Sequence, residues 1–281
     1  MTMPTPPMDS CPKTIADVEG LLGGRLPTTF EEAQQAFENL RIERERRAGY
    51  KMRAYFPDTG PYRRELYPKH IAFLNAGAIH RERLFLAGNR VGKPDVGSYE
   101  VACHLTGLYP HWWQGRRFDR PIKAWAAGDT SKTVRDIIQP KLVGEQAPVW
   151  HRTGMIPAHT IHHISHKSGA PGAVDTVWVK HVSGGFSTLG LKSYEQRREA
   201  FQGTSIEVIW LDEEPDQDIV TECLLRTMDT PTMPGGGLLM LTFTPLKGIG
   251  GGQAARGIPA KMKRRQSAIV LATHGSNRLT Y

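Results

Sequence analysis

The sequence predicts an α/β fold in which helices cover both faces of a mostly parallel sheet. Short apolar runs alternate with stretches of helical spacing between about Arg83 and Lys247. A glycine-containing loop that ends in Gly92-Lys93 connects the first of these runs to the first helical stretch. At 281 residues, with 39% hydrophobic and 23% charged residues, the chain is large enough to bury a substantial core.

The composition excludes several classes of protein. No apolar run approaches the roughly 18 residues of a membrane span, and residues 1–10 lack the pattern of a signal peptide. Cys11, Cys103 and Cys223 are odd in number and far apart, so neither a disulfide framework nor a cysteine-rich zinc site is expected. We therefore expect a protein of a reducing cytoplasm with no membrane partner.

The charge favours a polyanionic partner such as nucleic acid. The chain has a formal net charge of +8 and a pI near 9.5. Residues 249–281 contain six basic residues and no acidic residue, and without them the net charge is only +2. The six are Arg256, Lys261, Lys263, Arg264, Arg265 and Arg278. Sequence-independent DNA binding is therefore expected mainly from this tail.

Residues 1–53 are expected to form an N-terminal extension. Residues 1–28 are rich in Pro, Thr and Gly and are predicted to be irregular, whereas apolar residues at steps of three and four predict a helix from Thr29 to Arg53. Residues 41–47 mix both signs of charge around one apolar residue. This pattern is more typical of a solvated helix face than of a DNA-contacting arm.

Strands and helices then alternate through residues 54–247, which are expected to form the main domain. The predicted strands are Leu84–Ala87, Ile122–Ala127, Thr176–Val182, Ser187–Leu191, Val208–Leu211 and Leu238–Phe243. One helix is predicted over Pro94–Leu105, and a second is capped by Asp129-Thr130-Ser131 and stopped by Pro140.

The last part of the chain, residues 248–281, is expected to be a flexible basic tail. It begins with a Gly/Ala-rich stretch and continues with a basic cluster. Only Ala268–Ala272 has the composition of a strand.

The loop after the first predicted strand has features of a phosphate-binding loop. Such a loop needs small residues so that backbone amides can surround phosphate, a lysine for the β- and γ-oxygens, and a hydroxyl for Mg²⁺. Gly92-Lys93 supplies the first two features, but Ala87 replaces the usual first glycine and Pro94 replaces the usual Ser or Thr. For the loop taken alone, an ordinary glycine turn is the alternative.

A second element follows about 120 residues later. Residues 208–213 form an apolar strand that ends in Asp212 and Glu213, the form of a Walker B element. The strand would hold Asp212 near Mg²⁺, and Glu213 could orient and deprotonate an attacking water. An acidic strand end by itself is common, but its combination with the Gly-Lys loop favours nucleotide hydrolysis.

Four motifs in this order resemble the ATPase domain of tailed-bacteriophage terminase large subunits, which package double-stranded DNA into a preformed capsid. They are Leu86–Lys93, Asp129–Thr133, Trp210–Pro215 and Leu241–Pro245, within a resemblance that runs from about Tyr67 to Lys247. The resemblance implies a P-loop NTPase fold, ATP as substrate and Mg²⁺ as cofactor. It also implies double-stranded DNA, a portal protein and a small terminase subunit as partners. A homo-oligomeric ring in the host cytoplasm, at the procapsid portal, is the implied setting.

The same resemblance assigns roles to individual residues. Arg90 would stabilise the γ-phosphoryl transition state, Asp212 would hold Mg²⁺, and Glu213 would activate water. Thr242 and Thr244 would couple hydrolysis to DNA movement. Nucleotide binding is assigned to Gly88, Asn89, Arg90, Val91, Gly92, Lys93, Pro94, Tyr67 and His70, the last of which stands where relatives have Gln near adenine.

Two departures from the family pattern predict a truncated and impaired motor. Pro94 offers neither a hydroxyl nor a backbone N–H, although the first turn of a helix tolerates proline, and Asp95 adds a negative charge beside the triphosphate. Only 34 residues follow Lys247, too few for the family's nuclease domain, and no acidic residue follows Asp229. The alternatives are a catalytically inactive nucleotide- or DNA-binding remnant and another helicase-like P-loop ATPase.

Two further clusters have simpler interpretations. His159, His162, His163 and His166 have no Cys or acidic residue among them, which favours an exposed loop over a zinc site. Trp112-Trp113, followed by Arg116-Arg117, could stack on bases, but an aromatic anchor in the core is the favoured interpretation.

Overall fold

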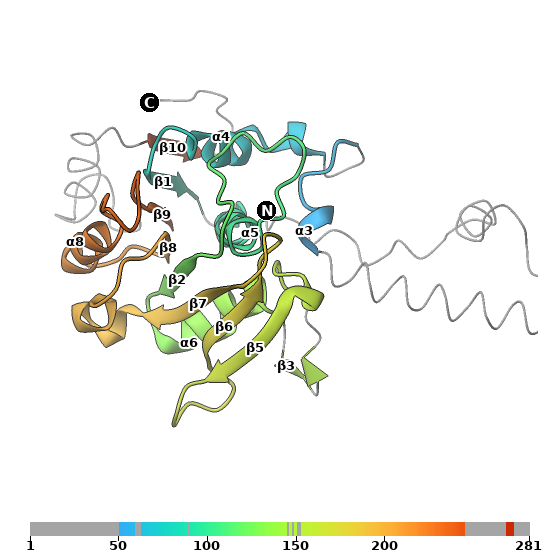
Figure 1. Cartoon of the computed structure of the whole chain (residues 1–281). Helices are drawn as coiled ribbons and strands as arrows, with labels where there is room; N and C mark the ends of the chain where they lie inside the picture. Colours follow the sequence, from blue (N-terminus) through green and yellow to red (C-terminus); the bar gives the residue numbers. More distant parts are fainter. Residues whose placement is uncertain are drawn as a thin grey trace, which may run out of the picture.

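An eight-stranded sheet forms the centre of the protein (Figure 1). The structure is a computed structural model, and it describes residues 51–59, 63–88, 90–144, 146–147, 149–150, 153–244 and 268–272. The strand order is β10-β1-β9-β8-β2-β7-β6-β5. The first six strands in this order are mutually parallel, whereas β6 runs antiparallel to β7 and β5 antiparallel to β6. The sheet and its helices confirm the predicted fold class.

The elements follow the predicted order. The strands are β1 (Glu82–Ala87), β2 (Lys123–Gly128), β5 (Ile161–His166), β6 (Val174–Lys180), β7 (Phe186–Ser193), β8 (Val208–Asp212), β9 (Leu238–Phe243) and β10 (Ala268–Ala272), with a separate small pair of β3 (Gln146–Ala147) and β4 (Val149–Trp150). The α-helices are α3 (Lys51–Ala54), α4 (Pro68–Ala76), α5 (Lys93–Thr106), α6 (Ser131–Thr133), α7 (Gln139–Leu142) and α8 (Gln217–Arg226). Shorter helical turns are η1 (Arg64–Leu66), η2 (Val134–Ile138), η3 (Ala158–Thr160), η4 (Tyr194–Gln196) and η5 (Arg198–Phe201).

Two hydrophobic cores lie on the two faces of the sheet. Successive side chains of a strand point to opposite faces, so neighbouring residues of β8 separate: Trp210 joins the core under α4 and α5, and Ile209 joins the core under α8 and η5. Figure 1 shows α5 and α8 on opposite sides of β8 and β9. Strands β5, β6 and β7 contribute buried side chains only to the core that contains α5, among the described residues.

The structure corrects the sequence prediction at Pro140 and at the clustered histidines. Pro140 does not stop the second helix, because a π-helical turn (η2) precedes it and α7 continues to Leu142. A wider π turn leaves room for the proline ring, which would clash with the carbonyl four residues earlier in a regular α-helix. Three of the clustered histidines lie on strand β5 and not in a loop. β10 coincides with the segment Ala268–Ala272 that has the composition of a strand, and its pairing with β1 extends the sheet beyond residue 247.

Other expectations for the two ends of the chain fall largely outside the described residues. The predicted N-terminal helix up to residue 50 and most of the basic tail are among these. No described helix has the length and apolar character that crossing a membrane requires.

Candidate nucleotide-binding site

The phosphate loop connects the end of β1 to the start of α5. Gly92 has a φ of 80° and is the N-cap residue of α5, and its carbonyl accepts from the amides of Asp95 and Val96, both at 3.1 Å. Arg90 also lies in the left-handed region, with a φ of 62°, and its side chain is exposed. The 14-residue helix α5 directs its N-terminal amides and positive dipole end toward this loop. Asn89 lies outside the described residues.

Lys93 lies over the loop at the first residue of α5. Its Nζ donates to the carbonyl oxygens of Ala87 at 3.2 Å and Gly88 at 2.7 Å, and to Thr244 Oγ1 at 2.6 Å. Burial lowers the pKa of Lys93, and the nearby carboxylates of Glu213 and Asp212 partly oppose this. The ammonium group is therefore held between the loop and the end of β9 by neutral acceptors, which a phosphate could replace.

Asp212 ends strand β8 in a buried chain of hydrogen bonds. Trp210 Nε1 donates to Thr242 Oγ1 at 2.8 Å, and this hydroxyl donates to Asp212 Oδ1 at 2.6 Å. Asp212 and Thr242 are cross-strand neighbours of parallel β8 and β9, which explains their contact. Burial raises the pKa of Asp212 to about 7, against the hydrogen bond from Thr242, which lowers it. Both threonines of the predicted coupling motif thus contact a predicted site residue.

Glu213 follows Asp212 in a strained backbone conformation. Its φ is 66°, and its amide donates to the Thr242 carbonyl at 3.1 Å. Tyr194, from η4, donates its hydroxyl to the carbonyl of Asp212 at 2.8 Å and has a second contact with the carbonyl of Glu213 at 3.3 Å. A left-handed conformation at a residue other than glycine persists only where its surroundings enforce it. The buried Tyr194 and strand β9 enforce it here, so the side chain of Glu213 leaves the sheet in a fixed direction.

Asp95, in the first turn of α5, is a paired charge. Its carboxylate is 2% exposed and accepts from Lys141 Nζ at 2.7 Å and from the Tyr55 hydroxyl at 2.9 Å. Lys141 comes from α7, and Tyr55 directly follows α3. The two donors compensate the charge of Asp95. Pro94 lies in the first turn of α5, where the sequence predicted that proline would be tolerated.

The segment before the loop contacts it through His70. The Nε2 atom of His70 lies 2.8 Å from the Val91 carbonyl oxygen, and burial lowers the pKa of this imidazole. A neutral imidazole with a protonated Nε2 donates this hydrogen bond. Tyr67 is the N-cap residue of α4 and lies edge-on to His70, with ring centroids 5.7 Å apart. These contacts place His70 beside the loop and Tyr67 beside His70, and the adenine contact that the resemblance implies stays a prediction.

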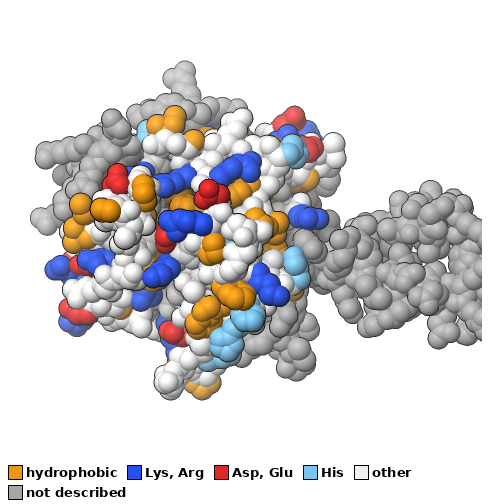
Figure 2. Space-filling view, viewed as in Figure 1, with side chains coloured by type: hydrophobic (Ala, Val, Ile, Leu, Met, Phe, Trp, Pro, Cys, Tyr) orange, Lys and Arg blue, Asp and Glu red, His pale blue; other side chains and the backbone are white. Residues whose placement is uncertain are grey.

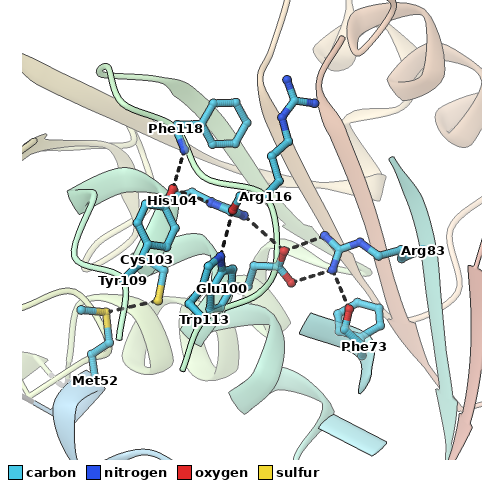
Figure 3. Close-up of polar contacts among 10 residues, drawn as sticks. All are labelled: Met52, Phe73, Arg83, Glu100, Cys103, His104, Tyr109, Trp113, Arg116 and Phe118. Carbon is cyan, nitrogen blue, oxygen red and sulfur yellow. Dashed lines mark hydrogen bonds and ion pairs between the residues drawn. The ribbon is translucent and has the colours of Figure 1, made fainter. Parts of the chain in front are cut away.

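A second buried polar cluster lies behind the loop (Figure 3). Glu100 of α5 accepts two hydrogen bonds from Arg83 of β1, at 2.6 and 2.9 Å, and His104 Nε2 lies 3.2 Å from the same carboxylate. All three side chains are fully buried. The positive charge of Arg83 keeps the pKa of Glu100 below its usual value despite burial. The ion pair therefore ties the helix that begins at Lys93 to the strand that precedes the loop.

The two other clusters singled out in the sequence do not form part of this site. Trp113 is 4% exposed and packs in the core, which confirms the predicted anchor. The described residues contain no group of three or more His, Cys, Asp or Glu that could hold a metal ion.

The fold and this loop define the class of α/β P-loop nucleoside triphosphatases. Residues 84–248 match the protein family described as terminase large subunit, T4likevirus-type, N-terminal. The chain therefore belongs to this family of terminase large subunits. It is 38% identical over 206 residues to the terminase large subunit of Salmonella phage P22, covering 65% of this chain and 39% of that protein. The chain thus spans about two fifths of the length of this relative.

A solved structure has a similar fold. The large terminase of a thermophilic bacteriophage matches with a TM-score of 0.50 and 12% sequence identity, over 73% of this chain and 44% of that chain. At this level of identity the likeness concerns the fold alone, and it agrees with the P-loop class that the sheet order and the loop define.

Proposed function

We propose that this chain binds and hydrolyses ATP with Mg²⁺ and couples hydrolysis to the movement of double-stranded DNA during viral genome packaging. The observation that supports this most is the meeting of Lys93, Asp212, Thr242 and Thr244 at one edge of the sheet. In parallel sheets flanked by helices, ligands bind at the carboxyl ends of the strands. Asp212, Thr242 and Thr244 lie at these ends, and Lys93 at the start of α5 reaches them through its Nζ.

The donor set fits Mg²⁺ bound together with phosphates. Mg²⁺ is commonly bound by one or two carboxylates, several waters and the phosphates of a substrate. Asp212 supplies one carboxylate, and its position is fixed by Thr242. A bound Mg²⁺ would supply positive charge to the β- and γ-phosphate oxygens.

The residues of the chain would divide the remaining work. Lys93 would leave its carbonyl acceptors for the β- and γ-phosphates, and Glu213 would accept a proton from the attacking water. Arg90 would place its exposed guanidinium near the γ-phosphate. Thr244 contacts Lys93, and Thr242 contacts Asp212. Both threonines would therefore change position when nucleotide binds, and β9 would move with them.

Pro94 is the reason to propose that the ATPase is impaired. For the same reason, a catalytically inactive nucleotide- or DNA-binding remnant is the second candidate. Proline supplies no hydroxyl to a metal and no N–H to a phosphate. We expect Pro94→Thr to raise the steady-state rate of ATP hydrolysis about 10- to 100-fold, equal to about 1.4–2.7 kcal/mol of barrier. Glu213→Gln in the same background should remove the gain and leave nucleotide binding intact. If Pro94→Thr changes nothing in a chain that already hydrolyses ATP fast, the impairment is refuted; if both proteins are inactive, the remnant is favoured.

The partners of the complete packaging motor are proposed on the family alone. They are double-stranded DNA, a portal protein and a small terminase subunit, with a ring of several copies at the procapsid portal in the host cytoplasm. Co-sedimentation of the full chain with portal complexes, with and without ATP, tests this part of the proposal.

A further inference from the structure

Among the described residues, no helix packs on one face of the sheet over β5, β6 and the start of β7, whereas Lys192 near the end of β7 contacts η5. The apolar side chains of these strands that point toward α5 are buried in the core, whereas the core on the opposite face contains no apolar side chain of β5–β7 among the described residues. In Figure 1, β5 and β6 lie in front and α6 lies behind them. We call the uncovered side of these three strands the open face.

Aromatic and imidazole rings lie on the open face. His162 stacks on Phe186 with ring centroids 4.3 Å apart and an interplanar angle of 24°, and His163 packs against its cross-strand neighbour Trp178 at 5.0 Å. A register irregularity between Ile161 and His163 is a β-bulge, which explains why two consecutive histidines can both reach rings on this face. Phe186 is 47% exposed.

Positive charge accompanies these rings. Lys180 pairs with Phe186 across β6 and β7 and is exposed. Lys192, further along β7, donates to the Ala200 carbonyl at 2.7 Å and lies over the Trp125 ring, so it is not part of the open face. Asp175 is the only acidic residue within β5–β7. Figure 2 shows histidine, hydrophobic and basic side chains side by side over β5 and β6. Exposed rings beside a lysine are complementary to bases joined by phosphates.

We propose that the open face binds a single-stranded segment of nucleic acid. His162, Phe186 and Trp178 would stack on bases, as aromatic side chains of other open sheets do, and Lys180 would contact the phosphates. Stacking requires exposed base faces, which a duplex hides, so the open face discriminates in favour of single strands. The site is separate from the nucleotide site and does not depend on ATP hydrolysis.

The test uses the full chain and fluorescein-labelled oligonucleotides without ATP. Fluorescence anisotropy should show tighter binding of a 20-nucleotide oligo-dT than of a duplex of the same length. Replacing both rings of the stack (His162→Ala with Phe186→Ala) should weaken single-strand binding about 10-fold or more. Lys180→Ala should reduce the slope of log affinity against log salt by about 0.7. Val182→Ala is the matched control, because Val182 is 61% exposed and lies outside the ring stack.

A second measurement does not depend on any variant. Photo-crosslinking of the wild-type chain to an oligonucleotide containing 5-iodouracil should label peptides from residues 161–193. Unchanged single-strand affinity in the double variant, or crosslinks confined to other segments, would overturn the proposal. Equal losses for duplex and single strand would overturn the stacking. Loss of a wild-type dimer in the double variant, measured by sedimentation velocity, would assign the open face to a second copy of this chain and would also overturn the proposal. ATP hydrolysis is measured separately, so that failure of the single-strand proposal can be distinguished from failure of the proposed function.

Discussion

Replacing Asp212 with asparagine is expected to stabilise the nucleotide-free protein while removing its ability to hold Mg²⁺. Asp212 is 2% exposed, and burial raises its pKa to about 7 from an ordinary 3.8. A pKa difference of one corresponds to about 1.4 kcal/mol. The raised pKa of Asp212 therefore lowers the free energy of unfolding by about 4 kcal/mol at pH 8 and by about 2 kcal/mol at pH 5.

The sign of the pH dependence follows from the protons bound in each state. Between pH 3.8 and about 7 the folded protein retains the proton of Asp212 that the unfolded chain has lost. The contribution of this group to stability therefore falls as the pH rises through this window and is constant above it. Asparagine keeps an oxygen to accept the 2.6 Å hydrogen bond from Thr242 and does not titrate.

The assay is urea unfolding followed by circular dichroism at pH 5, 6, 7 and 8, with EDTA and without nucleotide. The stability gain of Asp212→Asn over the wild type should grow from about 2 kcal/mol at pH 5 to about 4 kcal/mol at pH 8. Asp216→Asn is the control, because Asp216 is exposed and makes no side-chain capping bond. A gain that is the same at every pH would refute the reasoning from the buried carboxylate.

Two further predictions concern the buried ion pairs around the loop. Lys141→Met should weaken binding of a non-hydrolysable ATP analogue about 10-fold in calorimetry, because it leaves the charge of Asp95 unpaired at the start of α5. Adding Asp95→Asn to Lys141→Met should restore the affinity. If the double variant binds the analogue as weakly as Lys141→Met alone, Lys141 does not act by compensating the charge of Asp95. Arg83→Met should destabilise the protein by about 3–5 kcal/mol in urea unfolding, because Glu100 loses its main partner. Adding Glu100→Leu should recover most of this loss, and equal instability of both proteins would show that Arg83 acts through packing.

The parts of the fold that were predicted correctly have strong local patterns. β8 and β9 are buried on both faces and appear in the sequence as uninterrupted apolar runs, as central parallel strands do. β5 was missed because an edge strand with one open face has no need of apolar residues, and its His-rich sequence resembles a loop. Pro140 was taken as a helix stop because the preceding π turn has no sequence signature.

In the candidate site, too, residues in local motifs could be predicted, whereas their distant partners could not. Lys93 and Asp212 lie in contiguous motifs and could be found by their spacing. The partners that set their environment are far apart in the chain: Lys141 reaches Asp95 across 46 positions, and Tyr194 reaches Asp212 across 18. Such contacts arise from the packing of helices and strands, and no local sequence pattern predicts them.

Calorimetry of an ATP analogue with the wild-type chain and with Lys93→Ala is the decisive test of a nucleotide site in this loop. The Lys93 side chain contacts both the loop carbonyls and Thr244 of the coupling motif. We expect Mg²⁺-dependent binding to the wild type and a loss of about 10-fold or more in affinity on substitution, because a charge-assisted contact to phosphate disappears. Equal affinity of the two proteins would contradict the assignment of a nucleotide site to this loop.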